Sequence, residues 1–438
     1  MDTNKKPNLL FDASVITNIF CKDHNRSGIF FVAYNILREL GRRETFNISL
    51  YVTQDNSKFI RKMKREPFLF GFSIITLPEK EIFLFNISVH KQKMRETRNV
   101  FVKTFKFLQI IKNYILFFLF LLSFQDARNN RKLNNIDIFF SPNRAIPGRV
   151  KNHHSIKRFI VLHDTIPVLD RFIDTGAEWF VKIIQSLDTE THCFCVSENT
   201  KKDFLKALDS QIDERKMTVS SIATAQQFFP NYDKDALQAM LQKYGVSYNP
   251  NNAYIFSLCS IDPRKNLLFT IVCFVKFVQK HQIQNLYFYL GGGHFETFIA
   301  QFEKKLADFS EYRDKIVRLG YIDDEDVNIL YSNSLFFTYL SQYEGFGMPP
   351  LEAMQAGTPV ITSNNSSLPE VVGDAAITID YDSEEQCIKA FEDLYFNEDL
   401  RKHYIAKGLE RAKLFSWDKT VDKMTKAIMG VLGKTQHE

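Results

Sequence analysis

The sequence has 438 residues and a formal net charge of +5; 45% of its residues are hydrophobic and 24% are charged. These fractions are typical of globular proteins, and the length fits roughly two to three domains, which excludes a disordered, collagen-like or fibrous chain. No apolar run reaches about 18 residues, so the sequence predicts no ordinary transmembrane helix.

Positive charge is concentrated in the first third of the chain. Residues 1–150 contain 25 Lys or Arg and 12 Asp or Glu, a net +13, whereas the other residues contain 31 and 39, a net −8. A basic region favours an anionic partner such as a membrane surface or a nucleic acid, with an ordinary solvated surface as the alternative. The basic residues form no recognisable DNA- or RNA-binding module, so we expect no nucleic-acid partner.

The cysteines and the first residues favour the cytoplasm. The six cysteines have no C-x-x-C spacing, and we interpret them as reduced, small hydrophobic residues in a reducing compartment. Asp12 and Asn18 interrupt any apolar core of a secretory signal. We therefore expect a cytoplasmic protein.

In the first half of the chain, short apolar strands alternate with helical patterns. The expected strands cover residues 9–11, 48–52, 73–77, 136–140, 159–162 and 193–197. The expected helices cover residues 29–40 and 198–208, the second capped by Ser197. This alternation predicts a parallel sheet with helices on its faces.

The segment 100–124 differs from the rest of this half. Residues 114–124 (YILFFLFLLSF) are uncharged and nearly all apolar, and lysines lie upstream of them. As a helix these residues would span roughly 17 Å, well short of a bilayer core of about 30 Å. We interpret the segment as a helix lying in a membrane interface, with a buried core helix as the alternative.

A second α/β series begins after about residue 230. Its expected strands cover residues 254–258, 286–290, 316–318, 334–339 and 359–362, and a helix is expected at 267–281. Two successive α/β domains place a cleft between them, and ligands bind at the carboxyl ends of such strands.

The stretch 341–360, SQYEGFGMPPLEAMQAGTPV, carries the clearest chemical signal. It follows an expected strand, and Gly345 and Gly347 allow the backbone to approach a ligand closely. The two prolines favour the start of a helix, and a later glycine favours its end. A helix N-terminus behind a glycine loop is suited to bind a phosphate or diphosphate.

Four charged residues complete this predicted anion site. Glu344 and Glu352 would repel a phosphate, so we expect them to bind neutral sugar hydroxyls. Arg264 and Lys265 follow another strand of the same domain and can neutralise the phosphate.

The spacing of Glu344 and Glu352 in EGFGMPPLEAMQAGTPV resembles the signature of retaining glycosyltransferases of family GT4. The resemblance covers most of the C-terminal half, with weaker matches in the N-terminal half at 26–29 and 163–164. Two departures are Phe30, where the family often has a second glycine, and Leu340, where it usually has a proline. The further matching stretches in the C-terminal half are 264–266, 320–322 and 367–373.

The resemblance implies an α/β protein of the GT-B fold. Such a protein has two Rossmann-like domains facing across a cleft and a C-terminal helix that crosses back to the first domain. We expect an acceptor-binding domain at 1–225, a nucleotide-sugar-binding domain at 226–415 and the crossing helix at 416–438.

The resemblance also implies roles for individual residues. The candidate catalytic residues are Arg264 and Lys265 at the diphosphate, Glu344 at the donor sugar and His163 near the reaction centre. Glu352 would bind ribose, Tyr321 and Ile322 would border the base, and Gly28 would approach the diphosphate. The full set of implied donor-binding residues is Glu352, Gly345, Phe346, Gly347, Met348, Leu351, Gly28, Tyr321, Ile322 and Asn266.

The implied activity is retaining transfer of a sugar from a UDP- or GDP-linked donor to a hydroxyl, without metal or cofactor. The basic first third suggests a membrane-linked saccharide as acceptor, as in the assembly of lipopolysaccharide, capsule or another surface polysaccharide. The protein would then associate peripherally with the inner face of the membrane. Two alternatives are a nucleotide-sugar epimerase of the same fold and a non-catalytic nucleotide-sugar-binding scaffold.

Overall fold

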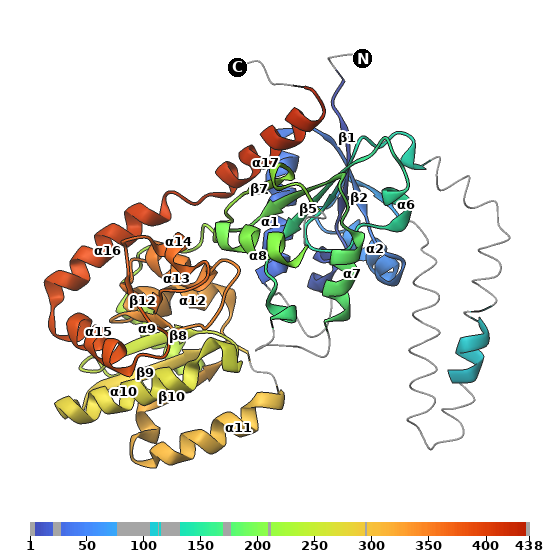
Figure 1. Cartoon of the computed structure of the whole chain (residues 1–438). Coiled ribbons are helices and arrows are strands. Elements are labelled where there is room, and N and C mark those ends of the chain that lie inside the picture. The colour runs from blue at the N-terminus through green and yellow to red at the C-terminus, as the bar shows by residue number, and fades with distance from the viewer. Residues whose placement is uncertain are drawn as a thin grey trace.

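The computed structural model describes residues 5–20, 28–76, 106–112, 114, 132–169, 177–208, 212–293 and 296–434. Within these residues the chain forms two parallel sheets, each covered by helices, in two domains (Figure 1). The predicted α/β class is therefore confirmed.

The first sheet has the strand order β3-β2-β1-β4-β5-β6-β7 in the described part of the chain. Its central strands are apolar runs buried on both faces, as parallel sheets require; Phe139 and Phe140 are both fully buried. Its strands are β1 (Asn8–Asp12), β2 (Asn47–Tyr51), β3 (Ser73–Ile75), β4 (Ile138–Ser141), β5 (Lys157–Leu162), β6 (Thr191–Cys195) and β7 (Met217–Val219). Its helices are α1 (Gly28–Arg43), α2 (Ile60–Met63), α6 (Gly148–Lys151), α7 (Glu178–Ser186) and α8 (Glu198–Ala207). The strand β7 was not predicted; it has three residues, too few for a periodicity signal.

The second sheet has the order β10-β9-β8-β11-β12-β13 in the same description. Its strands are β8 (Ala253–Leu258), β9 (Leu286–Gly291), β10 (Ile316–Gly320), β11 (Phe337–Tyr339), β12 (Val360–Ser363) and β13 (Ile377–Ile379). Its helices are α9 (Lys234–Lys243), α10 (Leu267–His281), α11 (Glu296–Leu306), α12 (Asp324–Asn333), α13 (Met348–Gln355), α14 (Leu368–Val372), α15 (Glu384–Phe396) and α16 (Glu398–Ala412). The predicted strand at 334–339 begins three residues later, because Ser334 is the C-cap of α12.

The final helix, α17 (Trp417–Val431), leaves the second domain and packs on α1 of the first domain (Figure 1). Trp417 is buried, and its Nε1–H donates to the Thr224 carbonyl oxygen at 3.0 Å. Arg43 of α1 binds Asp418 of α17 at 2.7 Å. The crossing of the C-terminal helix is thus confirmed.

The two domains also meet along the loops that follow their strands. Ser197, after β6, donates from its hydroxyl to the Gly345 carbonyl oxygen at 2.7 Å. Glu370 of α14 accepts hydrogen bonds from the backbone N–H groups of Glu198 and Asn199, both at 2.7 Å. A carboxylate of the second domain therefore caps the N-terminus of α8 in the first domain, where the helix dipole favours negative charge.

Only part of the apolar segment 100–124 can be compared with its prediction. Residues 106–112 are helical, with Ile110 buried and Phe107, Leu108 and Ile111 exposed. Residues 100–105, 113 and 115–124 lie outside the described residues. Among the residues that the structure describes, no helix is long and apolar enough to cross a membrane.

Candidate active site

The loop between β11 and α13 brings the predicted anion site together. Gly347 is the N-cap of α13 with φ of 113°, a conformation that favours glycine. Gly345 also has no space for a side chain, since a Cβ atom there would overlap the His163 carbonyl group of the first domain. Within residues 345–347, Gly345 thus permits a close contact with the first domain and Gly347 permits the start of α13.

Glu344 lies at the centre of a buried polar cluster. Its Oε1 accepts hydrogen bonds from Lys265 Nζ at 2.6 Å, Arg264 Nη1 at 2.8 Å, Tyr339 Oη at 2.8 Å and Ser341 Oγ at 2.6 Å. The Glu344 side chain is 12% exposed, as is that of Lys265. Burial by itself would raise the pKa of Glu344, but the charges of Lys265 and Arg264 outweigh it and lower the pKa to about 2. Glu344 is therefore ionised and paired with both cations.

The two cations reach Glu344 from a short turn after β8. Asp262 caps this turn by accepting from the Arg264 backbone N–H at 2.9 Å, and Pro263 opens it. The next residue, Asn266, has a φ of 56° and donates from its side chain to the Tyr381 carbonyl oxygen at 2.6 Å. The Asn266 side chain thus fixes the turn, and the cations point towards the β11 loop.

The second predicted glutamate has a different environment. Glu352 lies one turn into α13, and its Oε2 accepts a hydrogen bond from the buried Tyr331 hydroxyl at 3.0 Å. Burial raises the pKa of Glu352 to about 7 because no cation compensates its charge. Near neutral pH the carboxyl group can both donate and accept hydrogen bonds, which suits a pair of sugar hydroxyls.

His163 follows β5 and approaches the same region from the first domain. Its Nε2 lies 2.8 Å from the Pro142 carbonyl oxygen, which can only accept, so Nε2 carries the proton. Burial lowers the pKa of His163 to about 4. At neutral pH the ring is therefore uncharged, and Nδ1 is a hydrogen-bond acceptor.

The other predicted site residues divide into those at the domain contact and those in the core. A Cβ atom at Gly28 would overlap the Met348 side chain, so these two predicted residues meet across the domains. Tyr321 is 58% exposed, at the carboxyl end of β10. The remaining three have buried side chains and could contact a ligand through their backbone: Phe346, Leu351 and Ile322.

Several polar residues that complete the site were missed by the sequence reasoning. Tyr339 and Ser341 bind Glu344, and Tyr331 binds Glu352, although these tyrosines lie in ordinary apolar strand and helix patterns. Their hydroxyl groups leave no periodic signal, and only the fold aims them at the two carboxylates. Over the described residues, no group of three or more His, Cys, Asp or Glu could hold a metal ion.

Comparison with known proteins finds a family match within the second domain. Residues 245–411 match the family model described as glycosyl transferases group 1. The match covers 167 of the 438 residues and lies within the second domain. The matched region includes the Arg264–Lys265 turn, Glu344 of the β11–α13 loop, Glu352 of α13 and Glu370 of the domain contact.

Curated relatives of the chain include enzymes named for O-antigen synthesis. The chain is 29% identical over 234 residues to O-antigen chain mannosyltransferase B of Escherichia coli, covering 53% of this chain and 59% of the relative. It is 26% identical over 295 residues to serotype-specific mannosyltransferase WbdA of Escherichia coli, covering 64% of this chain and 34% of that protein. The chain thus spans less than two thirds of the length of these relatives.

Solved structures agree with the GT-B fold over nearly the whole chain. Sucrose-phosphate synthase from Thermosynechococcus elongatus has a TM-score of 0.66 at 15% identity, covering 98% of this chain and 100% of that one. Anabaena Alr3699/HepE in complex with UDP and glucose has a TM-score of 0.64 at 12% identity, covering 97% and 100%. WaaG, a glycosyltransferase involved in lipopolysaccharide biosynthesis, has a TM-score of 0.59 at 13% identity, covering 92% of this chain and 96% of that one. At these identities the likeness shows the fold, and the predicted GT-B architecture is confirmed.

Proposed function

We propose that the chain is a retaining, metal-independent glycosyltransferase that moves a sugar from a nucleotide-sugar to a hydroxyl of a membrane-linked saccharide. The observation that carries this proposal is the buried cluster of Arg264, Lys265 and Glu344 beside the N-terminus of α13, in a group 1 domain. The names of the mannosyltransferase relatives support a role in surface polysaccharide assembly and make mannose the first sugar to test.

In the proposed step, the bond between the anomeric carbon and the diphosphate oxygen breaks, and the nucleoside diphosphate leaves with the electron pair. The acceptor oxygen bonds to the anomeric carbon on the face that the diphosphate leaves, and its proton passes to a diphosphate oxygen. Arg264 and Lys265 would stabilise the negative charge that develops on the leaving group. In this scheme the two cations supply the neutralisation and no metal is required.

Each carboxyl group has a separate part in the proposal. Glu344, ionised and held by four donors, would orient the Arg264–Lys265 pair and contact the donor sugar. Glu352, with a pKa of about 7, would bind the ribose hydroxyls. Neutral His163 would accept a hydrogen bond from the donor sugar at Nδ1. Contact between the domains would exclude water and limit donor hydrolysis.

The experiment is a thermal-shift screen of UDP- and GDP-linked sugars, followed by a transfer assay with the donors that stabilise the protein. We expect Arg264→Ala to abolish transfer, and Arg313→Ala, an exposed arginine of the same domain, to retain it. The anomeric configuration of the product, measured by NMR, tests retention. Conversion of the donor without acceptor would indicate an epimerase, and binding without turnover would indicate a scaffold; either result refutes the proposal.

The proposed acceptor is presented at the inner face of a cytoplasmic membrane, on an anionic surface. The net charge of +13 in residues 1–150 and the apolar segment 100–124 support this part of the proposal. Charged substitutions within residues 114–122 should release the protein from vesicles. Unchanged vesicle binding by such a variant, folded as wild type, would refute contact through that segment.

A further inference from the structure

A strongly basic loop lies between β2 and β3 at the edge of the first sheet. Five exposed cations occur within residues 58–65, and the single acidic residue between 58 and 72 is Glu66. Within the described structure, none of the five forms an ion pair with a carboxylate. We call residues 58–72 the basic loop; its cations are Lys58, Arg61, Lys62, Lys64 and Arg65.

The same loop exposes an aromatic side chain. Backbone N–H groups of Leu69 and Phe70 both donate to the Glu66 carbonyl oxygen, and Gly71 has a φ of 98°, which closes a tight turn. Phe70 is 78% exposed at this turn. An exposed phenyl ring beside several cations is typical of segments that enter a lipid interface.

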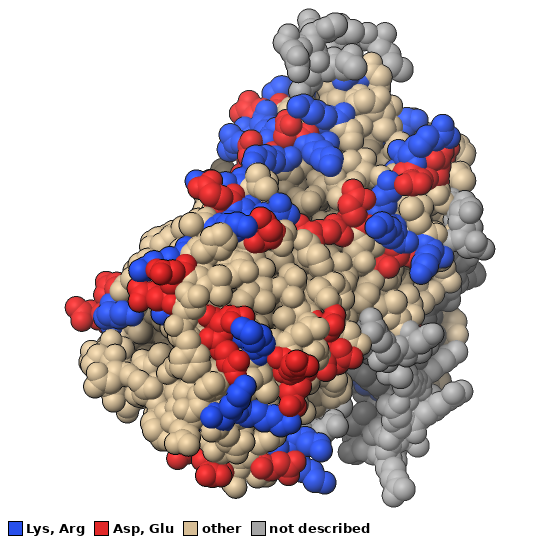
Figure 2. Space-filling model, turned by 60° about the vertical axis from the view of Figure 1, so that its left-hand side comes forward, with Lys and Arg blue, Asp and Glu red and all other residues tan. Residues whose placement is uncertain are grey.

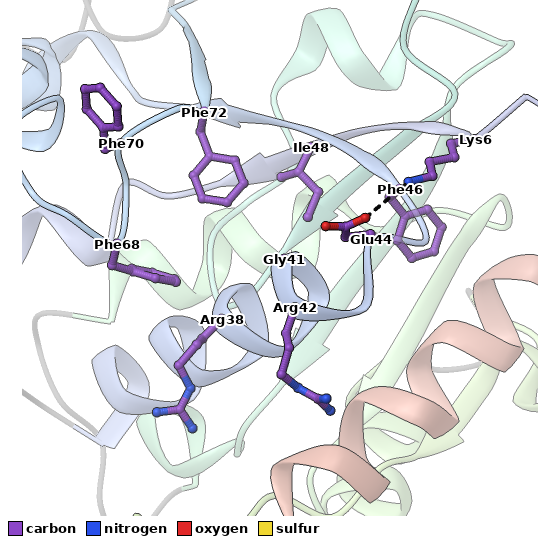
Figure 3. A pocket seen from close by; sticks show the side chains of 10 residues that line it. All are labelled: Lys6, Arg38, Gly41, Arg42, Glu44, Phe46, Ile48, Phe68, Phe70 and Phe72. Carbon is purple, nitrogen blue, oxygen red and sulfur yellow. Dashed lines mark ion pairs between the residues drawn. The ribbon is translucent and has the colours of Figure 1, made fainter.

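A pocket of about 440 Å³ lies beside the turn (Figure 3). One side is aromatic, with Phe68 and Phe72 from the basic loop, and the other carries Arg38 and Arg42 from α1. Arg42 forms ion pairs with Glu39 at 2.9 Å and with Asp418 at 2.8 Å. Arg38 forms a longer ion pair, in which its Nε lies 3.7 Å from Glu39 Oε1. The pocket is lined by Lys6, Arg38, Gly41, Arg42, Glu44, Phe46, Ile48, Phe68, Phe70 and Phe72.

The basic loop connects the carboxyl end of β2 with the start of β3. Its pocket lies beside residues that precede β1 and β2, namely Lys6, Glu44 and Phe46. Figure 2 shows acidic and basic side chains mixed over one face of the molecule. The basic loop thus combines spread positive charge, an exposed ring and a pocket with an aromatic side.

We propose that the basic loop and its pocket bind anionic phospholipid and dock the protein on a membrane surface. Phosphate groups of several lipids would contact the five cations, Phe70 would enter the interfacial layer, and the pocket would receive an apolar segment of one lipid beside Arg38. Cations spread along a loop match a surface of many phosphates better than a single free phosphate. The inference rests on the proposed function only in taking the acceptor to be membrane-linked.

The test is sedimentation of the full chain with vesicles of phosphatidylglycerol and phosphatidylcholine in equal parts, and with phosphatidylcholine alone. The loop variant replaces its five cations with Gln, and a second variant is Phe70→Ser. Matched controls replace five exposed lysines outside the first domain with Gln and exchange Phe396, 59% exposed, for Ser. The control lysines are Lys389, Lys402, Lys407, Lys413 and Lys426.

We expect wild type and both controls to bind the anionic vesicles, with affinity that falls as salt rises. The loop variant should lose more than about 100-fold in affinity, and Phe70→Ser should weaken binding without changing its salt dependence. All variants should have the melting temperature of wild type. Equal binding by the loop variant and its control would overturn the proposal, as would saturable competition by inorganic phosphate for the vesicle-binding site.

A transfer assay with a water-soluble acceptor separates this inference from the proposed function. The loop variant should transfer sugar as fast as wild type, because the basic loop contacts none of the candidate catalytic residues. If the loop variant loses vesicle binding but wild type transfers no sugar, only the proposed function is refuted. Normal transfer with unchanged vesicle binding would refute only the lipid site.

Discussion

Replacing Glu344 with Gln should destabilise the second domain strongly, because it leaves two buried cations without their shared carboxylate. The pKa of Glu344 falls from its ordinary value of 4.5 to about 2 in the folded protein. At about 1.4 kcal/mol per tenfold change, this corresponds to about 3 kcal/mol of stabilisation of the ionised form. Removing one partner of a buried ion pair costs about 3–5 kcal/mol in other proteins, which agrees with that value.

The stability difference between wild type and Glu344→Gln should change with pH in a defined direction. Glu344 has a lowered pKa, so its contribution is complete above pH 4.5 and is lost as the pH falls from there towards about 2. The difference in unfolding free energy between wild type and Glu344→Gln should therefore be constant at neutral pH and shrink in acid.

Urea unfolding at neutral and acidic pH measures this difference, and a loss of about 3 kcal/mol should lower the Tm by about 6–12 °C for a domain of this size. The control is Glu398→Gln, since Glu398 is an exposed carboxylate paired with Lys402 and its removal should leave the Tm unchanged. Equal stability of Glu344→Gln and wild type, or a difference that does not vary with pH, would refute the reasoning.

Three further predictions follow from single contacts. The buried Glu352 carboxyl has a raised pKa, so wild type should lose up to about 3 kcal/mol of unfolding free energy as the pH rises from 4.5 through about 7. The Glu352→Gln variant should not show this loss, and urea unfolding across that pH range measures the difference. Glu370→Gln should weaken the cap on α8 by about 1–2 kcal/mol and loosen the domain contact, seen as a larger radius of gyration by small-angle X-ray scattering; unchanged dimensions contradict it. Trp417→Ala should cost about 3–5 kcal/mol in urea unfolding, whereas the exposed Trp179→Ala should cost little.

The sequence predicted most strands of both sheets because parallel strands buried on both faces are continuous apolar runs. The strands β8 and β9 match their predicted ranges to within one residue. The helix α13 was predicted from the two prolines and the glycines around it, which are local signals. The three-residue strands β7 and β13 were not predicted, whereas β3 and β11, which are equally short, were predicted within longer apolar runs at 73–77 and 334–339.

The structure brings Arg264, Lys265 and Glu344 of the candidate site into contact, but this pairing was not predicted. The resemblance implied that Arg264 and Lys265 would bind the diphosphate, whereas in the structure both bind Glu344, about eighty positions further along the chain. The predicted sites at Phe346 and Leu351 have buried side chains, since both lie on the core side of the β11–α13 segment. The spacing of residues along the chain predicts which residues lie close together, but it does not predict the direction in which each side chain points.

The sequence by itself determined the two-sheet architecture, the glycine loop before α13 and the set of charged residues around it, since all of these depend on local periodicity and backbone conformation. Only the tertiary structure decided that two glutamates of one motif differ in pKa by about five, at about 2 and about 7. The difference arises because two cations from the β8 turn reach Glu344, while a buried tyrosine of α12 meets Glu352. The protonation state of a carboxyl group depends on its burial and on charges that folding brings close, and the spacing of residues in the sequence predicts neither.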